Sequence, residues 1–136
     1  ILPFLLVDFF DFSKNGGFLE SVELCNGSAD CRKTELTGGT MCPSYMATRD
    51  EAHTTRSRAN TLRELMTQRE DLAFTSPELE QSMELCLMCK GCKMECPSNV
   101  DMATYKSEYL FQKFKVNSPS FTQKKMAQVP HWHLSI

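Results

Sequence analysis

Apolar residues recur at helical spacing in three stretches of the chain, and the first stretch predicts the longest helix. Thr48 and Glu51 have the form of a capping box, in which each side chain bonds to the other residue's backbone N–H. The helix is therefore expected to begin there and to run to about Asp71. Its apolar positions follow the spacing of one helix face: Ala59, Leu62, Leu65, Met66 and Leu72.

Two further helices are predicted downstream. Ser76-Pro77-Glu78 is a start signal, with Pro at the first helical position. This short helix should turn Leu79, Met83 and Leu85 inward and end just before Cys86. The third helix covers about 100–115, with Ser98 or Asn99 as its cap. Its predicted inner face carries Val100, Ala103, Ser107, Leu110, Phe111 and Phe114.

The remaining segments have weaker patterns. Residues 1–24 mix aromatic and polar positions, which predicts irregular chain or short strands that dock onto another surface. The apolar run from Leu2 to Val7 is far shorter than the ~20 residues of a membrane span and lacks the features of a signal peptide. The expected organisation is a docking segment 1–24, a domain 25–115 and a tail 116–136. The fold class is mostly α, with cysteine-bearing loops between helices.

Composition narrows the function through its cysteines. The chain has 136 residues and a net charge of −2, which suits one globular domain and gives no case for binding nucleic acid. Its seven cysteines are an odd number, so they cannot all form disulfides within the chain. Clustered thiols without a secretory signal predict a reducing, cytoplasmic compartment.

Four cysteines form a dense run. Cys86, Cys89, Cys92 and Cys96 read C-x2-C-x2-C-x3-C-P, the bacterial ferredoxin pattern. Gly91 is expected to let the chain pass close to an inorganic core. Zinc usually takes paired C-x2-C halves joined by a longer spacer, so the run favours an iron–sulfur cluster over zinc or disulfides.

The other three cysteines resemble an incomplete copy of this run. Ser28 stands where the second cysteine would be, between Cys25 and Cys31, and Cys42-Pro43 stands where Cys96-Pro97 does. In two-cluster ferredoxins the fourth cysteine of each run ligates the other cluster. The predicted ligand sets are therefore Cys42, Cys86, Cys89 and Cys92 for a [4Fe–4S] cluster, and Cys25, Cys31 and Cys96 for a second site.

Three thiolates at the second site leave three outcomes open. The site holds a [3Fe–4S] cluster, or a [4Fe–4S] cluster with an oxygen ligand from Ser28, Asp30 or water, or no cluster. One further choice also stays open. Arg56 and Arg58 either offset the negative charge of a cluster or belong to a solvated helix face. Met41, Met88 and Met94 are expected to shield cluster sulfurs from water.

The cysteine segments and their neighbours closely resemble one family, the C-terminal α-helical ferredoxin domain of large FAD-linked oxidases. Its members include the glycolate oxidase, D-lactate dehydrogenase and D-2-hydroxyglutarate dehydrogenase types. The resemblance runs from about Phe10 to Phe114 and is carried by segments 25–33, 39–45, 47–51, 55–59 and 99–106.

This resemblance implies an electron-transfer function. In such proteins a flavin domain oxidises a 2-hydroxy acid, and the ferredoxin domain passes its electrons singly to an acceptor, often a quinone pathway or another redox protein. The flavin and substrate regions have no counterpart in this sequence, so FAD is expected only on a partner domain or subunit, and the chain should not be catalytic alone. The expected location is the cytoplasm or the inner face of a respiratory membrane. The alternatives are a zinc-stabilised interaction module and a truncated, non-functional piece.

Overall fold

The described part of the chain is mostly helical. The computed structural model describes residues 8–68 and 73–125, and no strand occurs within these ranges. Three helices form its body: α3 (Thr55–Gln68), α4 (Pro77–Glu84) and α6 (Met102–Val116). Shorter helices are α1 (Phe18–Val22), α2 (Pro43–Thr48) and α5 (Gly91–Glu95). The predicted fold class, mostly α with cysteine-bearing loops between helices, is confirmed.

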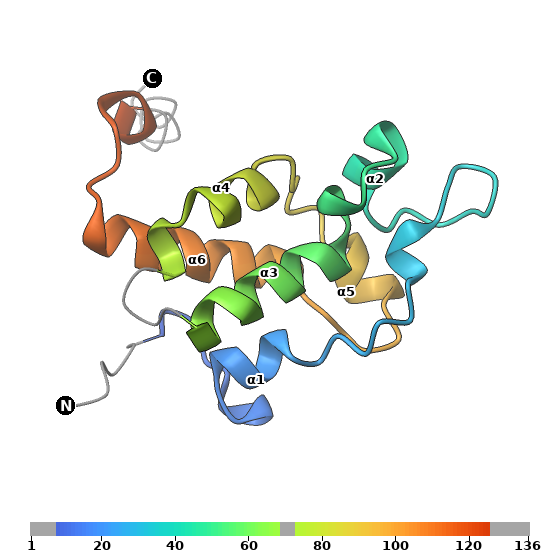
Figure 1. Ribbon diagram of the computed structural model, residues 1–136, viewed down its shortest axis with the longest axis horizontal. Coiled ribbons are helices and arrows are strands. Elements are labelled where there is room, and N and C mark those ends of the chain that lie inside the picture. Colours follow the sequence, from blue (N-terminus) through green and yellow to red (C-terminus); the bar gives the residue numbers. More distant parts are fainter. Residues whose placement is uncertain (1–7, 69–72, 126–136) are drawn as a thin grey trace, which may run out of the picture.

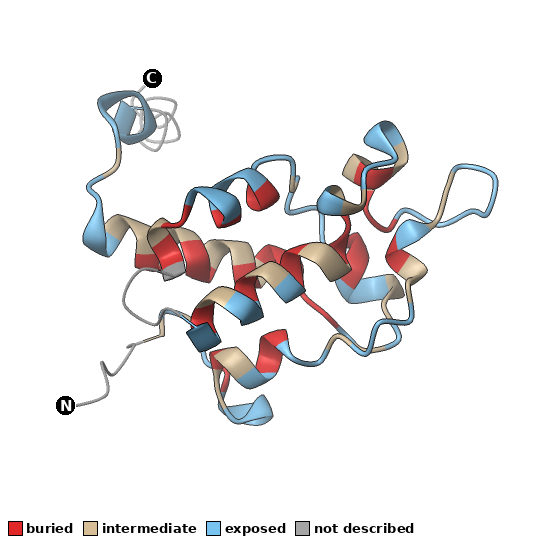
Figure 2. Ribbon diagram, in the orientation of Figure 1, coloured by how far each residue is buried: buried red, intermediate tan, exposed pale blue. Residues whose placement is uncertain are grey.

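The long helix α3 is the centre of the arrangement. It contacts α1, α4 and α6, while α2 and α5 lie with the cysteine loops at one end of the molecule (Figure 1). The buried positions concentrate where these helices face one another (Figure 2). Leu62, Leu79 and Val100 are completely shielded from solvent there. The core therefore forms between the long helices, and the cysteines surround the end of it.

An aromatic cluster joins the N-terminal segment to α6. The rings of Phe12 and Phe18 lie 4.9 Å apart and both contact Tyr105 of α6. The Tyr105 hydroxyl donates a hydrogen bond of 2.6 Å to the Ser21 carbonyl. The described part of the predicted docking segment 1–24 is thus the helix α1 with short 3₁₀ and irregular chain, and it docks on its own domain. The expectation for Leu2 to Val7 lies outside the described residues.

A buried carboxylate also holds this segment. Glu108 of α6 is fully shielded from solvent and accepts backbone hydrogen bonds from Phe9 (2.9 Å) and Phe10 (3.1 Å). The Gln112 side-chain amide donates a third hydrogen bond, of 2.7 Å, to the other carboxylate oxygen of Glu108. Since these donors satisfy the buried carboxylate, its burial is tolerated and the segment is held against α6.

The predicted capping box is wrong. Thr48 is the last residue of α2, and Asp50 caps a separate 3₁₀ turn by accepting a bond of 2.9 Å from the Ala52 N–H. Helix α3 begins only at Thr55, where the Thr54 hydroxyl accepts the Ser57 N–H at 3.0 Å. Thr48 and Thr54 both carry a hydroxyl that can cap a helix. The 3₁₀ turn capped by Asp50 lies between them, so the long helix starts after Thr54 and not after Thr48. The predicted end at Asp71 lies outside the described residues.

The later helices match the prediction in place but differ in detail. Helix α4 starts with Pro77 and buries Leu79 and Met83 as expected, but Leu85 is 42% exposed because the helix has already ended at Glu84. The cap of α6 is Asp101, which accepts the Thr104 N–H at 3.2 Å, and neither Ser98 nor Asn99 takes this position.

The buried face of α6 differs from the predicted one. Its fully buried stripe runs through Met102, Tyr105, Tyr109 and Gln112, whereas the predicted positions from Ser107 to Phe114 are only half-buried. Val100, just before the helix, and Ala103 are buried as predicted. The N-terminal segment covers one flank of α6, as the ring contact of 5.0 Å between Phe9 and Phe111 shows, so α6 buries more than one stripe. Within the described ranges, no helix combines the length and apolar character needed to cross a membrane.

Replacing Glu108 by Ala should release the N-terminal segment. The change leaves the Phe9 and Phe10 N–H groups without their acceptor, and we expect a loss of about 2 kcal/mol in the free energy of unfolding. Urea denaturation measures the loss, and amide hydrogen exchange at Phe9 and Phe10 should accelerate. Glu64→Ala, at an exposed carboxylate of α3, is the control and should change neither. Equal stability of the Glu108 variant and wild type would contradict the interpretation.

Candidate metal centre

One pocket gathers four cysteines from both halves of the chain. Cys42 comes from the residue that precedes α2, Cys86 and Cys89 come from the loop between α4 and α5, and Cys92 comes from α5. These are the four residues of the first predicted ligand set. The other residues lining the pocket are Pro43, Ser44, Thr55, Arg58, Leu87, Met88, Met102 and Ala103.

Backbone strain is concentrated at the cysteine loops. Cys42 (φ 60°), Met88 (φ 54°) and Lys90 (φ 60°) adopt left-handed conformations, which are uncommon for residues other than glycine. Met88 and Lys90 flank Cys89, so the chain turns sharply on both sides of this cysteine. Alternation of right- and left-handed residues is the backbone pattern that forms anion-binding nests, including those of many iron–sulfur sites. Such strain persists where the surroundings enforce it, and it points to a functional site.

Glu95 holds the loop before Cys42 against α5. Its carboxylate accepts hydrogen bonds from the Thr40 N–H (2.6 Å), the Thr40 hydroxyl (2.7 Å) and the Met41 N–H (3.2 Å). The bonds from the Thr40 hydroxyl and then its N–H lower the pKa of Glu95. Because Glu95 lies between Cys92 and Cys96 in the sequence, these bonds attach the first cysteine motif to the second.

Gly91 permits the same contact. A Cβ at this position would lie 3.1 Å from the Thr40 carbonyl oxygen, so the α5 backbone approaches the Thr40–Met41 chain more closely than a larger residue would allow. The expectation from sequence was that Gly91 makes room for an inorganic core. The structure shows a close approach to the segment that carries Cys42, and the expectation about an inorganic core stays a prediction.

The buried sulfurs of Cys42 and Cys92 have several hydrogen-bonding neighbours, and the Cys42 thiol donates to the His53 carbonyl at 3.3 Å. The Met102 N–H points at the Cys92 sulfur at 3.4 Å, and the Thr55 hydroxyl lies 3.3 Å from the Cys42 sulfur. Burial raises the pKa of the Cys92 thiol, and the Met102 N–H opposes that rise. The Met102 N–H thus stabilises the Cys92 thiolate, the form that binds metal, against the larger effect of burial.

A lysine fixes the start of the second motif. The Lys106 ammonium of α6 donates to the carbonyls of Met83 (2.7 Å) and Cys86 (2.8 Å). It thereby satisfies a carbonyl at the end of α4 and positions the loop that begins at Cys86. Burial lowers the pKa of Lys106. The ammonium therefore loses part of its hydration, and hydrogen bonds to backbone carbonyls replace the lost contacts with water.

The second predicted ligand set lies apart from this pocket. Cys31 is buried in a 3₁₀ turn, Cys25 and Cys96 are half-buried, and none of the three lines the pocket. Burial raises the pKa of the Cys31 thiol, while hydrogen bonds from the Arg56 N–H and the Thr54 side chain lower it. Ser28 is exposed, and its N–H bonds to the Asn26 side chain at 3.1 Å.

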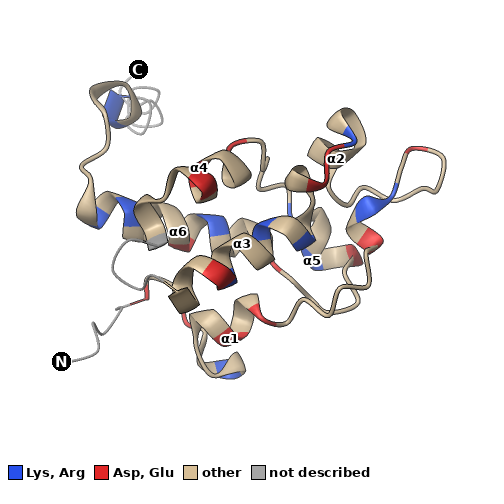
Figure 3. Ribbon diagram, viewed as in Figure 1, with Lys and Arg blue, Asp and Glu red and all other residues tan. Residues whose placement is uncertain are grey.

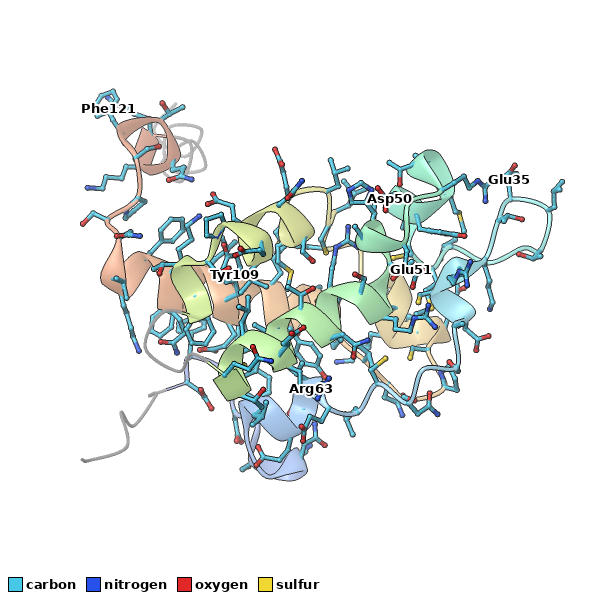
Figure 4. All side chains as sticks on the ribbon, in the orientation of Figure 1. Glu35, Asp50, Glu51, Arg63, Tyr109 and Phe121 are labelled. Carbon is cyan, nitrogen blue, oxygen red and sulfur yellow. The ribbon has the colours of Figure 1, made fainter. Side chains whose placement is uncertain are left out.

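The beginning of α3 therefore faces both cysteine sets. Thr54 and the Arg56 N–H face Cys31, while Thr55 and Arg58 face Cys42. Glu51, labelled near this turn in Figure 4, pairs with Arg56 and with Arg32 at 3.1 Å, and so ties the turn bearing Cys31 to α3. Donors at a helix N-terminus carry partial positive charge, which suits neighbouring thiolates.

Shielding of cluster sulfurs by methionine stays a prediction. Met41 is 1% exposed, whereas Met88, which lines the pocket, and Met94 are exposed, Met94 to 83%. Leu87 and Cys89 are exposed beside the pocket as well, so the loop of the second motif forms its open edge. Surface charges nearby are interleaved (Figure 3), with Lys93 pairing to Asp101 at 3.1 Å.

All seven cysteines lie within the described residues and all are free thiols. In the described ranges, no three His, Cys, Asp or Glu side chains are grouped as ligands of a single metal ion. The thiolates of a cubane bind different iron atoms and so do not need to meet at one point.

Comparison with known families decides the class of the domain. The family model described as "4Fe-4S dicluster domain" matches residues 24–101. The chain belongs to this family. The 4Fe-4S dicluster assignment confirms the resemblance to ferredoxin domains and supports iron–sulfur clusters as the cofactors.

A curated relative agrees with the assignment. The chain is 24% identical over 148 residues to a D-2-hydroxyglutarate dehydrogenase of Pseudomonas putida, an alignment that covers 78% of the chain. It covers 15% of the relative, so the dicluster domain spans only a small part of that dehydrogenase. No solved structure matches the chain.

Replacing Glu95 by Gln should weaken the link between the two motifs in a pH-dependent way. The pKa of Glu95 is lower in the folded protein, so its contribution is complete above the unfolded pKa of about 4.3 and is lost as the pH falls through the folded value. At pH 7 we therefore expect a lower urea midpoint for the variant than for wild type. This difference should shrink as the pH falls from about 5 to 3.

The control is Glu64→Gln, at an exposed carboxylate of α3, which should match wild type at every pH. A difference between the Glu95 variant and wild type that stayed constant over the whole pH range would show that the carboxylate charge does not hold the loop.

Proposed function

We propose that this chain is an iron–sulfur electron-transfer module that passes single electrons from a partner flavin to a downstream acceptor. The observation that carries the proposal is the pocket that combines Cys42 with Cys86, Cys89 and Cys92. Crossed ligation, in which the last cysteine of one motif serves the cluster of the other, requires this combination. The membership in the dicluster family supports the same chemistry.

In this proposal, Cys42, Cys86, Cys89 and Cys92 hold a [4Fe–4S] cluster, which when bound supplies a reversible one-electron carrier. The protein provides the surroundings that set its reduction potential. Burial of Cys42 and Cys92 limits access of water, and the donors at Thr55 and Met102 stabilise the thiolate charge. No side chain has to move during electron transfer, because the ligands are fixed by α2, α5 and the strained loop between α4 and α5.

The second set, Cys25, Cys31 and Cys96, holds in this proposal a [3Fe–4S] cluster. Membership in a dicluster family supports a second cluster site. Three thiolates are available, and Ser28 takes the position that the cysteine spacing assigns to the fourth. An iron atom bound there would have only a serine oxygen, which is a poorer ligand than thiolate for an iron–sulfur cluster.

The electron donor belongs to a partner. The relative is named a D-2-hydroxyglutarate dehydrogenase, and the dicluster chain spans 15% of it. We infer that oxidation of a 2-hydroxy acid takes place on an FAD-containing domain or subunit, and that the dicluster domain is not catalytic alone. A quinone pathway or a redox protein receives the electron. We place this transfer in the cytoplasm or at the inner face of a respiratory membrane.

The proposal predicts the metal content of the protein and of two variants. Anaerobically purified wild type should contain iron and acid-labile sulfide, about four of each for every cubane. Cys42→Ala should remove the cubane signal of the reduced protein in paramagnetic resonance, because its sulfur belongs to the set of the second motif. Cys96→Ala should leave that signal in place.

Two results would contradict this prediction. Zinc without sulfide in wild type would establish the structural alternative. Loss of the cubane signal in the Cys96 variant, with retention in the Cys42 variant, would show that each motif ligates its own cluster.

The replacement Ser28→Cys should complete the second site. Ser28 is exposed, so a thiol there needs no rearrangement of the core. We expect the oxidised wild type to show the paramagnetic signal of a three-iron cluster, and the variant to lose it while gaining about one iron per chain. Ser57→Cys, on helix α3, is the matched control and should retain the three-iron signal. Absence of that signal from oxidised wild type would exclude the [3Fe–4S] assignment.

A further inference from the structure

Arg58 is a buried cation without a carboxylate partner. Its side chain is 2% exposed, and among the described residues no Asp or Glu lies within ion-pair distance of it. Its neighbour Arg56, by contrast, pairs with Glu51. A guanidinium that stays charged in the protein interior requires nearby negative charge. The source of that charge at Arg58 has to be found in its contacts.

The contacts of Arg58 lead to Cys42. Its Nε donates to the Ser82 carbonyl at 2.8 Å and one terminal nitrogen donates to the Ser44 hydroxyl at 3.0 Å. The other terminal nitrogen points at the Cys42 sulfur at 3.6 Å. The two serine contacts, from α2 and α4, fix the guanidinium so that its remaining donors face the pocket. Of these three contacts, only the Cys42 sulfur can carry a negative charge, and it does so as the thiolate that ligates the proposed cluster.

Thr55 reinforces this contact from the first turn of α3. It is 3% exposed, and its hydroxyl lies 3.3 Å from the same sulfur. Helix α3 has 14 residues, so the partial positive charge of its N-terminus also lies on this side. A side-chain cation, a hydroxyl and a helix terminus thus lie at one cysteine, whose sulfur also contacts the His53 carbonyl at 3.3 Å.

We propose that Arg58 and Thr55 are positioning residues for the Cys42 thiolate and that they raise the reduction potential of the cluster that this thiolate ligates. The inference rests on the proposed [4Fe–4S] assignment. Reduction adds one electron, supplied by a chemical reductant or the partner flavin, and neither breaks a bond nor needs a proton. It makes the thiolate-bound cluster more negative by one charge, so a fixed positive charge at the sulfur favours the reduced state.

The experiment is a redox titration of the anaerobically purified chain, with dithionite as reductant and the paramagnetic signal of the reduced cubane as readout. Arg58→Gln should lower the equilibrium constant for one-electron reduction at least tenfold, a shift of about 59 mV toward negative potential. Arg63→Gln removes the same charge from an exposed position on the same helix, labelled in Figure 4, and should leave the potential unchanged.

A second variant keeps the inference testable if the Arg58 variant does not fold. Thr55→Val keeps the shape of the side chain and removes only the hydroxyl, and it should shift the potential in the same direction by a smaller amount. If Arg58→Gln yields no cluster, the Thr55 variant decides the question, and an unchanged potential there overturns the inference.

The outcomes separate this inference from the proposed function. Wild-type protein without iron and sulfide would overturn the proposed function itself. Wild-type protein with a cubane, together with an Arg58 variant that has the same potential as wild type and the Arg63 variant, would overturn the inference alone.

Discussion

The structure depends on bringing Cys42 to three cysteines that come from the far half of the chain. Local spacing places Cys86, Cys89 and Cys92 together, but only tertiary contacts can deliver Cys42. Glu95 supplies the main link, because its carboxylate binds the Thr40–Met41 backbone from within the second motif. Gly91 allows the approach, and Arg58 joins α2, α3 and α4 behind the same cysteine.

Charge is the second constraint, and it follows from the first. Burial raises the pKa values of two cysteine thiols, Cys92 in the pocket and Cys31 outside it, because a thiolate is poorly solvated in the protein interior. The donors that oppose this rise come from main-chain N–H groups at Arg56 and Met102. In the proposed function, metal binding replaces the protons, so cluster assembly and stability of the fold are coupled.

The features that sequence could predict are those that depend on local spacing. The cysteine run and the start of α4 at Pro77 follow from neighbouring residues, and the family confirms the class that the run indicated. The beginning of α3 was missed, because both Thr48 and Thr54 carry capping hydroxyls and only the turn at Asp50 decides between them. Nothing in the local pattern marks Glu95 as the link to Thr40, since its partner lies 55 residues away. For Arg58, the sequence left two roles open, compensation of cluster charge or a place on a solvated helix face. Only its burial in the structure distinguishes it from Arg56, which pairs with Glu51.

The positions of burial and exposure also give the proposed module a direction. Cys42 is buried where α2 meets the beginning of α3, while Cys89, Leu87 and Met88 form the exposed edge of the same pocket. Protein between two redox centres lengthens the distance that an electron must cross, so a partner that docks at the loop between α4 and α5 has the shorter path. The enclosed side then has a different task. There, the buried Arg58 and Thr55 contact the Cys42 sulfur, so the groups inferred to set the potential of the proposed cluster are shielded from solvent.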